Sequence, residues 1–144
     1  MTIRQATPSD IPSILSLYAE LHLADGAIPL EMAESSFSQA MQSGVIYFVA
    51  VEDEKIIGSL YIAIIPNITK QCASIGFIEN VVVAEKYRRK GIGKSLIEAA
   101  VQTAKDKGCY KVILSSNIKR TEAHKFYESI GFDGNSKRTF EIRF

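Results

Sequence analysis

A short basic loop with two glycines is the segment of this sequence best suited to chemistry. Its basic and glycine residues are Arg88, Arg89, Lys90, Gly91, Gly93 and Lys94. The residues before it indicate a strand ending near Val83, and those after it predict a helix over residues 91–107. The N–H groups at the start of a helix lack intrahelical partners, and the helix dipole favours an anion there. The loop is therefore a candidate phosphate site, or else only a glycine-rich connection between strand and helix.

The run Gly91-Ile92-Gly93-Lys94-Ser95 also resembles the end of a nucleotide-binding P-loop. That motif needs a glycine five positions before its second glycine, and this position is Arg88. A side chain there occupies space where the nucleotide loop requires bare backbone. The next predicted strand, KVILSSN, ends in no aspartate that could hold Mg²⁺. The sequence therefore excludes a P-loop nucleotide hydrolase.

A carboxylate, Glu79, stands among apolar residues in the strand before the loop. One interpretation is a strand-edge or salt-bridged glutamate, because a buried carboxylate is costly unless it is paired. The other is a base that removes a proton from an ammonium substrate, directly or through water. Alternation predicts that Asn80 faces the opposite side of the strand, unless a bulge changes its facing.

Hydrophobic periodicity predicts a mixed α+β fold. Strands are expected over 2–6, on both sides of a turn at 52–55, and over 73–84, 110–115 and 138–144. Helices are expected over 11–22, 30–42, 91–107 and 121–130. Three consecutive strands favour an antiparallel meander, and the strand–helix–strand unit after them requires a parallel, right-handed crossover.

Composition excludes several classes of protein. A net charge of +1 argues against nucleic acid as the main partner. No apolar run is long enough to span a bilayer, and the first ten residues do not read as a signal peptide. Two cysteines without a CxxC pair predict neither a disulfide framework nor a metal site. We therefore expect a cytoplasmic protein with no metal and no membrane partner, and exposed edge strands near the C-terminus are compatible with a homodimer.

The loop and the segments after it resemble the GNAT superfamily of N-acetyltransferases. Arg88, Gly91 and Gly93 match its R/Q-x-x-G-x-G/A motif, and Asn117 matches an asparagine that follows the next strand. The family's A-x-x-F-Y helix pattern ending in G-F is matched by Ala123, Phe126, Tyr127, Gly131 and Phe132. The resemblance implies a GNAT fold over residues 1–144 as a single domain. In that fold an antiparallel meander joins a splayed parallel strand pair, and about four helices flank the sheet.

The same resemblance implies acetyl-CoA as the co-substrate and direct attack of an amine in a ternary complex. The residues expected to bind coenzyme A are Val81, Val82, Val83, Arg88, Arg89, Lys90, Gly91, Ile92, Gly93, Lys94 and Asn117. Glu79 is the expected base, and Tyr127 is expected to protonate the departing thiolate. Tyr127 also lies on the apolar stripe of its helix, where an aromatic residue usually belongs to the core.

The acceptor is expected to be a primary amine of a small molecule. No Lys or Arg lies between Gln5 and Glu54, against eight acidic residues, whereas residues 55–144 carry sixteen basic and eight acidic ones. This separation favours a cationic acceptor on the N-terminal part. The 117–132 stretch, however, resembles aminoalkylphosphonate and other small-amine acetyltransferases, and a phosphonate would favour an anionic acceptor. A protein or peptide N-terminal or lysine acetyltransferase, and a non-catalytic CoA-binding regulatory module, remain the alternatives.

Overall fold

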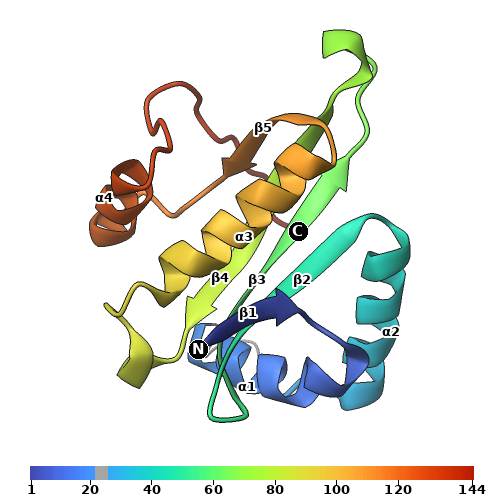
Figure 1. Cartoon of the computed structure of the whole chain (residues 1–144), viewed down its shortest axis with the longest axis vertical. Helices are drawn as coiled ribbons and strands as arrows, with labels where there is room; N and C mark the ends of the chain where they lie inside the picture. The colour runs from blue at the N-terminus through green and yellow to red at the C-terminus, as the bar shows by residue number, and fades with distance from the viewer. Residues whose placement is uncertain (22–25) are drawn as a thin grey trace. The chain divides into compact units, whose positions relative to one another are not determined.

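The computed structural model describes residues 1–21 and 26–144, so His22, expected at the end of the first helix, lies outside the described residues. The strands are β1 Thr2–Gln5, β2 Val45–Glu52, β3 Lys55–Ile65, β4 Ser74–Val83 and β5 Cys109–Leu114. The helices are α1 Ile11–Leu21, α2 Leu30–Gln42, α3 Ile92–Asp106 and α4 Thr121–Ser129 (Figure 1). Three short 3₁₀ helices accompany them: η1 Pro8–Asp10, η2 Lys70–Cys72 and η3 Glu85–Tyr87. The chain forms two compact units, residues 1–113 and 114–144.

The first unit is built on a sheet with the strand order β1-β2-β3-β4-β5. The first four strands pair antiparallel, and β5 returns parallel to β4 after the α3 crossover. The predicted meander and the predicted parallel pair are therefore confirmed. The register places Tyr47 opposite Tyr61 and Tyr61 opposite Glu79, so that three strands contribute one transverse row.

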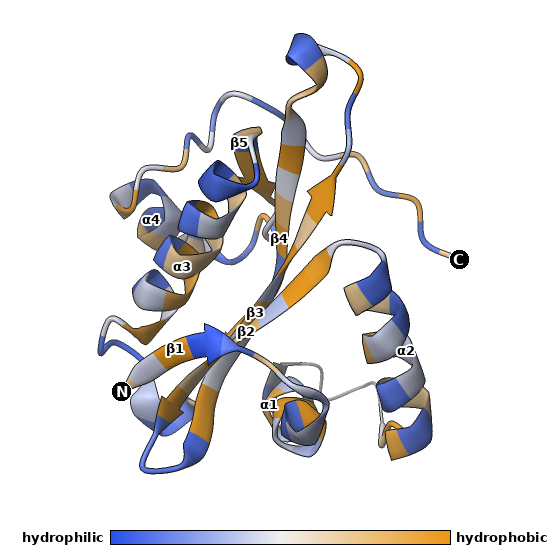
Figure 2. Cartoon of the chain, turned by 45° about the vertical axis from the view of Figure 1, so that its right-hand side comes forward, coloured by the Kyte–Doolittle hydropathy of each residue, from blue (hydrophilic) through white to orange (hydrophobic). Residues whose placement is uncertain are grey.

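Helices pack on both faces of this sheet because its strands alternate between two apolar faces. On one face, a β-carbon added at Gly58 would lie 3.1 Å from Leu96 of α3. On the other face, Val49 packs with Ile11 and Ile14 of α1 and with Phe37 of α2. Hydrophobic colour runs along the central strands in Figure 2, whereas α3 alternates between hydrophilic and hydrophobic residues.

The connection from β1 to α1 is fixed by a charged cluster. Both Arg4 guanidinium nitrogens donate to Asp10, at 2.7 and 2.9 Å, and the Thr7 backbone N–H donates to the same carboxylate at 2.8 Å. The arginine, followed by the Thr7 hydrogen bonds, lowers the pKa of Asp10 to about 2, against the opposing effect of burial. Asp10 is therefore the reciprocal partner of the N-cap Thr7 in a capping box at η1, and it ties η1 to the first strand through Arg4.

One predicted strand is absent, which corrects the expected topology. Residues 138–144 form no helix or strand in the structure. Phe140 and Ile142 are 89% and 84% exposed, and Phe144 is fully exposed. Alternating apolar residues predict a strand, but a strand is stable only when its backbone pairs with a neighbour. The described residues supply no such neighbour, and these hydrophobic side chains stay in solvent.

No helix in the described ranges is both long and apolar enough to cross a membrane.

Candidate active site

The basic loop lies between the end of β4 and the start of α3, as the sequence predicts. Gly91 is the N-cap of α3 and has φ +81°, a left-handed conformation that favours glycine. No side chain caps this end of the helix. Its first N–H groups are therefore free to bind an anion.

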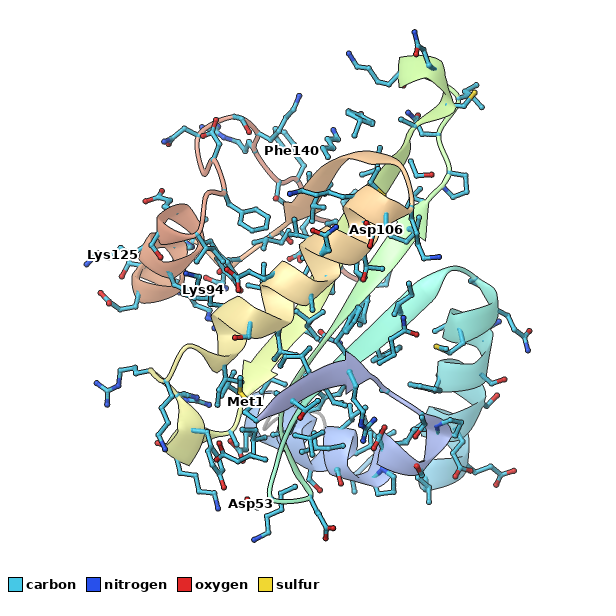
Figure 3. The ribbon with its side chains drawn as sticks, viewed as in Figure 1. Met1, Asp53, Lys94, Asp106, Lys125 and Phe140 are labelled. Atoms are coloured by element: carbon cyan, nitrogen blue, oxygen red, sulfur yellow. The ribbon has the colours of Figure 1, made fainter. Side chains whose placement is uncertain are left out.

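The charges at the start of α3 run against the helix dipole. The first turn contains no acidic residue and Lys94 lies near this end (Figure 3), whereas the last turn holds both Lys105 and Asp106. Arg88, Arg89 and Lys90 precede the helix directly. Cations at a helix N-terminus are unfavourable by a few tenths of a kcal/mol each. An anion bound at the loop would offset this cost, which explains why basic residues cluster at the start of α3.

The basic side chains differ in how they are held. The Arg88 Nε donates to the Val83 carbonyl at 3.0 Å, so this side chain closes the loop onto the strand. The ammonium groups of Lys86 and Lys90 lie 5.1 and 5.2 Å from the ring centroid of Tyr87. Lys94 forms a long ion pair with Glu98 at 3.8 Å, both side chains being exposed. Arg88 is thus a structural anchor, and the lysines stay near the helix start.

A bulge interrupts β4 just before the loop. Ser59 pairs with Val82 and Tyr61 with Glu79, so Asn80 and Val81 together oppose one residue of β3. Asn80 has φ +52°, in the left-handed region that Asn tolerates better than most residues. Its side chain lies close enough to Tyr18 to lower the pKa of that phenol, as does Ser59. Asn80 therefore lies on the same face of the sheet as Ser59. The bulge changes its facing, whereas simple alternation would have placed it on the opposite face from Glu79.

Two buried hydroxyl groups lie beside this bulge. The Tyr18 hydroxyl from α1 and the Ser59 hydroxyl from β3 are buried and have no hydrogen-bond partner among the described residues. Burial raises the pKa of Tyr18 well above its usual range, and the nearby Asn80 and Ser59 offset this only in part. Buried polar groups are normally satisfied, so an unsatisfied pair requires an explanation.

An aromatic row leads across the same face to Glu79. The rings of Phe37 and Tyr47 lie 5.0 Å apart, and those of Tyr47 and Tyr61 lie 5.2 Å apart. Burial, followed by the negative charge of Glu79, raises the pKa of Tyr61. Glu79 is thus within electrostatic reach of the Tyr61 hydroxyl. The expected base lies at the end of a row of tyrosines.

Asn117 and Tyr127 belong to the second unit. The Asn117 side-chain oxygen accepts from the Lys119 N–H at 2.9 Å, and its carbonyl accepts from the Arg120 N–H at 2.9 Å. The same carbonyl lies 2.8 Å from a ring nitrogen of His124. Asn117 therefore organises the turn that precedes α4.

Tyr127 lies in α4 among other aromatic side chains. Its ring centroid is 5.3 Å from that of Phe126 and 6.2 Å from that of Phe132. Its backbone carbonyl accepts from the Ile130 and Phe132 N–H groups at 3.2 and 3.1 Å. The helix end and these rings fix the position of Tyr127 within its unit.

Comparison with known proteins agrees with this geometry. The profile described as the acetyltransferase (GNAT) family matches residues 12–132, which reach into both units. The chain belongs to the acetyltransferase (GNAT) family. The predicted family, its α+β fold and the N-acetyltransferase class of enzyme are thereby confirmed.

Three relatives illustrate the similarity. A glucosamine 6-phosphate N-acetyltransferase of Trypanosoma brucei brucei is 33% identical over 140 residues, which are 96% of this chain and 92% of the relative. A putative acetyltransferase from Agrobacterium tumefaciens is 36% identical, with a TM-score of 0.94 over 100% of both chains. The glucosamine-6-phosphate N-acetyltransferase of Arabidopsis thaliana is 27% identical, with a TM-score of 0.86 over 98% of this chain and 97% of the other.

For this GNAT chain, the structure groups the predicted residues within each unit. Glu79 and Val81 to Val83 lie in β4, and Arg88 to Lys94 form the loop and helix start that follow it, all in the first unit. Asn117 and Tyr127 lie in the second. The described residues contain no cluster of His, Cys, Asp or Glu suited to a metal ion.

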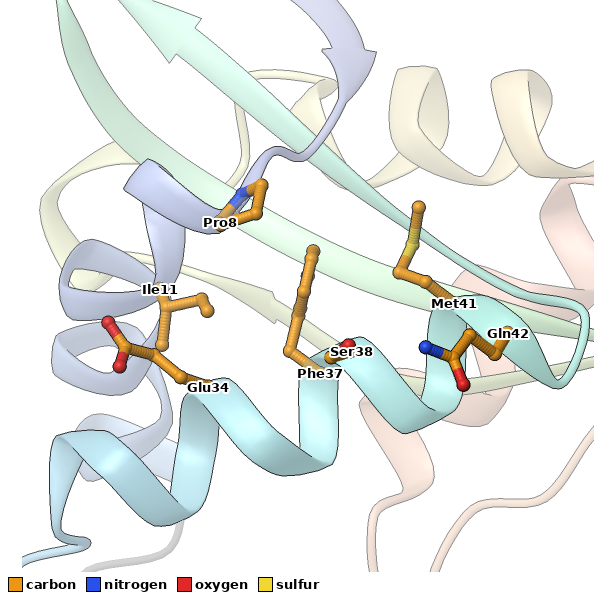
Figure 4. A pocket seen from close by; sticks show the side chains of 7 residues that line it. All are labelled: Pro8, Ile11, Glu34, Phe37, Ser38, Met41 and Gln42. Atoms are coloured by element: carbon orange, nitrogen blue, oxygen red, sulfur yellow. The ribbon is translucent and has the colours of Figure 1, made fainter.

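A separate hollow of about 490 Å³ lies between η1, the start of α1, and α2 (Figure 4). Its lining residues are Pro8, Ile11, Glu34, Phe37, Ser38, Met41 and Gln42. None of the predicted site residues belongs to this lining. The hollow shares only Phe37 with the aromatic row.

Four residues near Glu79 were not predicted as site residues from the sequence: Tyr18, Tyr47, Ser59 and Tyr61. In the hydrophobic pattern, each of these residues looks like an ordinary core or strand residue. Strand register and helix packing place them near Glu79. Plain alternation from the two-residue turn would place Tyr47 opposite Leu60, and the register shift between Ala50 and Val51 is what brings Tyr47 opposite Tyr61. Extending the row to Glu79 requires the register of β4, which the bulge shifts.

Proposed function

We propose that this GNAT chain transfers an acetyl group from acetyl-CoA to a primary amine of a small molecule. The observation that carries the proposal is the uncapped, cation-rich start of α3 directly after β4. Coenzyme A carries a pyrophosphate, and a helix N-terminus with glycine and lysine residues binds such an anion. Val81 to Val83 would line the pantetheine arm, which extends from the pyrophosphate toward the bulge.

The proposed reaction is a direct acyl transfer. Glu79 accepts a proton from the ammonium form of the acceptor, and the neutral nitrogen attacks the thioester carbonyl. A nitrogen–carbon bond forms, the carbon–sulfur bond breaks, and Tyr127 donates a proton to the thiolate. The second proton that the nitrogen loses on becoming an amide passes through solvent and restores the Tyr127 hydroxyl. A bulge leaves one residue outside the strand ladder, so a backbone N–H near Val81 is available to polarise the thioester carbonyl.

A small-molecule acceptor is supported by relatives named for glucosamine 6-phosphate, which align over nearly the whole chain. Peptide N-termini and lysine side chains are the competing acceptors, and coenzyme A binding without catalysis is the competing non-enzymatic role. Peptide and lysine acceptors are distinguished from a small molecule by comparing substrates of different size. Binding without catalysis is distinguished by measuring whether acetyl-CoA is turned over.

A thiol-release assay with acetyl-CoA and a panel of amines tests the proposal. The panel contains glucosamine, glucosamine 6-phosphate, a polyamine, an aminoalkylphosphonate and a short peptide with a free N-terminus. We expect release that depends on a small amine and product that carries one acetyl group. Release with the peptide alone would contradict a small-molecule acceptor, and acetyl-CoA binding without release for every amine would contradict catalysis.

A further inference from the structure

The tyrosine row on β2 and β3 ends at Glu79, a carboxylate with no counterion among the residues that the structure describes. Glu79 lies opposite Tyr61, and the Tyr61 ring lies 5.2 Å from that of Tyr47. The Glu79 carboxylate forms no ion pair or side-chain hydrogen bond with any residue that the structure describes. A half-buried carboxylate beside aromatic rings is a favourable environment for a cation.

The elements that cover this face offer no cation of their own. Arg4 is the one basic residue before Lys55 in the sequence. Its guanidinium is bound in two hydrogen bonds by Asp10. The helices α1 and α2 instead bring Glu20, Glu31 and Glu34. These elements therefore attract a positive charge and provide no partner for a phosphate.

Two further polar groups lie one row away on the same face. Ser59 is 0% exposed, and its hydroxyl and that of Tyr18 have no partner among the described residues. Both groups donate and accept hydrogen bonds, as an alcohol of a ligand does. The two hydroxyls lie near each other and near Asn80, close enough to lower the pKa of Tyr18, and a ligand hydroxyl would give them the well-formed partner that the described residues do not.

We propose that Glu79, Tyr61 and Tyr47 form the ammonium subsite of the acceptor, with Tyr18 and Ser59 beside it as hydrogen-bonding groups for a hydroxylated frame. The proposal rests on the acetyltransferase function above and deepens it. It assigns a cationic, unphosphorylated amine as the substrate class, in contrast to the glucosamine 6-phosphate for which relatives are named. Tyr61 and Tyr47 then determine specificity, separately from the proton transfer assigned to Glu79.

A binding measurement tests the subsite without turnover. Tetramethylammonium is a cation that cannot be acetylated, and tyrosine dominates the emission because the chain has six tyrosines and no tryptophan. We expect a saturable change in tyrosine fluorescence with tetramethylammonium chloride and none with sodium chloride at equal ionic strength. Tyr61→Leu should weaken this binding roughly 2- to 30-fold, as loss of a cation–π contact predicts, and Tyr61→Phe should preserve most of it.

The matched control is Tyr110→Leu, which removes a tyrosine that is 41% exposed on β5. It should leave tetramethylammonium binding unchanged, and thermal melts establish that all variants fold. A wild-type protein without saturable binding, or equal losses in Tyr61→Leu and Tyr110→Leu, would overturn the subsite.

A second arm compares two acceptors that differ only in a phosphate. We expect a higher kcat/KM for glucosamine than for glucosamine 6-phosphate, and a KM for glucosamine that rises in Tyr61→Leu while the Kd for acetyl-CoA stays constant. A preference for the phosphorylated sugar would refute the assigned substrate class. Tetramethylammonium binding without acetyl transfer to any amine would instead support the subsite and refute the proposed function.

Discussion

The surroundings of Glu79 and of Tyr127 position the two side chains in different ways. Glu79 is half-buried in β4, where the strand register fixes its neighbours and leaves its carboxylate unpaired among the described residues. Tyr127 lies in α4 between two other aromatic rings, which restrict where its hydroxyl can point. The proposed division of labour follows from this chemistry, since a carboxylate accepts a proton and a phenol donates one.

Replacing Tyr127 by Phe should lower kcat by about 10- to 10⁴-fold, because a thiolate with a pKa near 8.5 needs moderate help to leave. The Kd for acetyl-CoA should change far less, since the ring remains. Steady-state kinetics and equilibrium binding measure the two quantities, and Tyr110→Phe, which removes the hydroxyl of a 41% exposed tyrosine on β5, is the control. An unchanged kcat would remove Tyr127 from the mechanism.

Residue types were enough to identify the loop and Glu79 as candidates, whereas Tyr127 became a candidate only through the family resemblance, because its place on an apolar stripe is that of a core residue. The tyrosine row could not be found this way. Tyr47 and Tyr61 read as strand residues, and their link to Glu79 depends on a bulge that shifts the β4 register. The sequence does not reveal the left-handed backbone at Asn80, because an asparagine indicates this conformation less strongly than a glycine would.

At the scale of elements, α3 is flanked at each end by a glycine with a left-handed backbone conformation. Gly91 precedes the helix with φ +81° and Gly108 follows it with φ +74°, and an added β-carbon would meet nothing within 4 Å at either position. Substitution at either glycine therefore introduces backbone strain without a clash. Only Gly91 lies at the proposed phosphate site.

Gly91→Ala and Gly108→Ala form a matched pair. Each should lower the free energy of unfolding by about 1–2 kcal/mol, the cost of a left-handed L-residue. Gly91→Ala should also weaken acetyl-CoA binding, whereas Gly108→Ala should leave it intact. Denaturant unfolding and calorimetric titration with acetyl-CoA give both quantities. Equal acetyl-CoA affinities in the two variants would argue against the N-terminus of α3 as the phosphate site.

The Arg4–Asp10 cluster predicts a pH-dependent stability. The pKa of Asp10 is lowered from 3.8 to about 2 in the folded protein, so its contribution is complete above about pH 4 and is lost as pH falls toward 2. Allowing for an arginine side chain that is 42% exposed, we expect this contribution to be about 1–2 kcal/mol.

Asp10→Asn should therefore unfold more easily than the wild type at neutral pH and about equally at pH near 2. Urea unfolding across this pH range measures the difference. A deficit of the same size at both ends of the range would show that the lost stability comes from the capping geometry and not from the charge.

At the scale of the whole molecule, the C-terminal segment 138–144 pairs with no strand in the described part of the chain. Phe140, Ile142 and Phe144 alternate along it and are exposed, and β5 ends the strand order of the sheet. Exposed alternating residues and an open sheet edge both favour pairing with another chain. We therefore expect a homodimer in which this segment forms a strand with a second copy.

Light scattering after gel filtration should give a dimer mass for the wild type and a monomer for the double variant Phe140→Ser, Ile142→Ser. The control Ile118→Ser changes a hydrophobic residue that is 85% exposed but lies outside the alternating segment. It should remain dimeric. A monomeric wild type, or dissociation caused equally by Ile118→Ser, would contradict this interface.

The sequence predicted the order of nine elements and failed at the tenth, because alternation reports an amphipathic segment and not the strand that pairs with it. Residues 30–42 and the hairpin turn at 52–55 were found because propensity, period and breakers agree there. The residues 138–144 follow the same alternation, yet their partner is not specified by anything local. The identity of the acceptor could not be predicted for a similar reason, because its proposed binding residues are brought together by the register of the strands.

We propose above all that one acetyl group passes from acetyl-CoA to an amine bound to this chain. Nuclear magnetic resonance with an isotopically labelled acetyl group on acetyl-CoA follows this transfer directly, with glucosamine and glucosamine 6-phosphate as competing acceptors in one sample. We predict that the thioester signal decays as the amide signal of N-acetylated glucosamine grows, and that Tyr127→Phe slows both together. A thioester signal that persists, or that decays only to free acetate, would contradict the account.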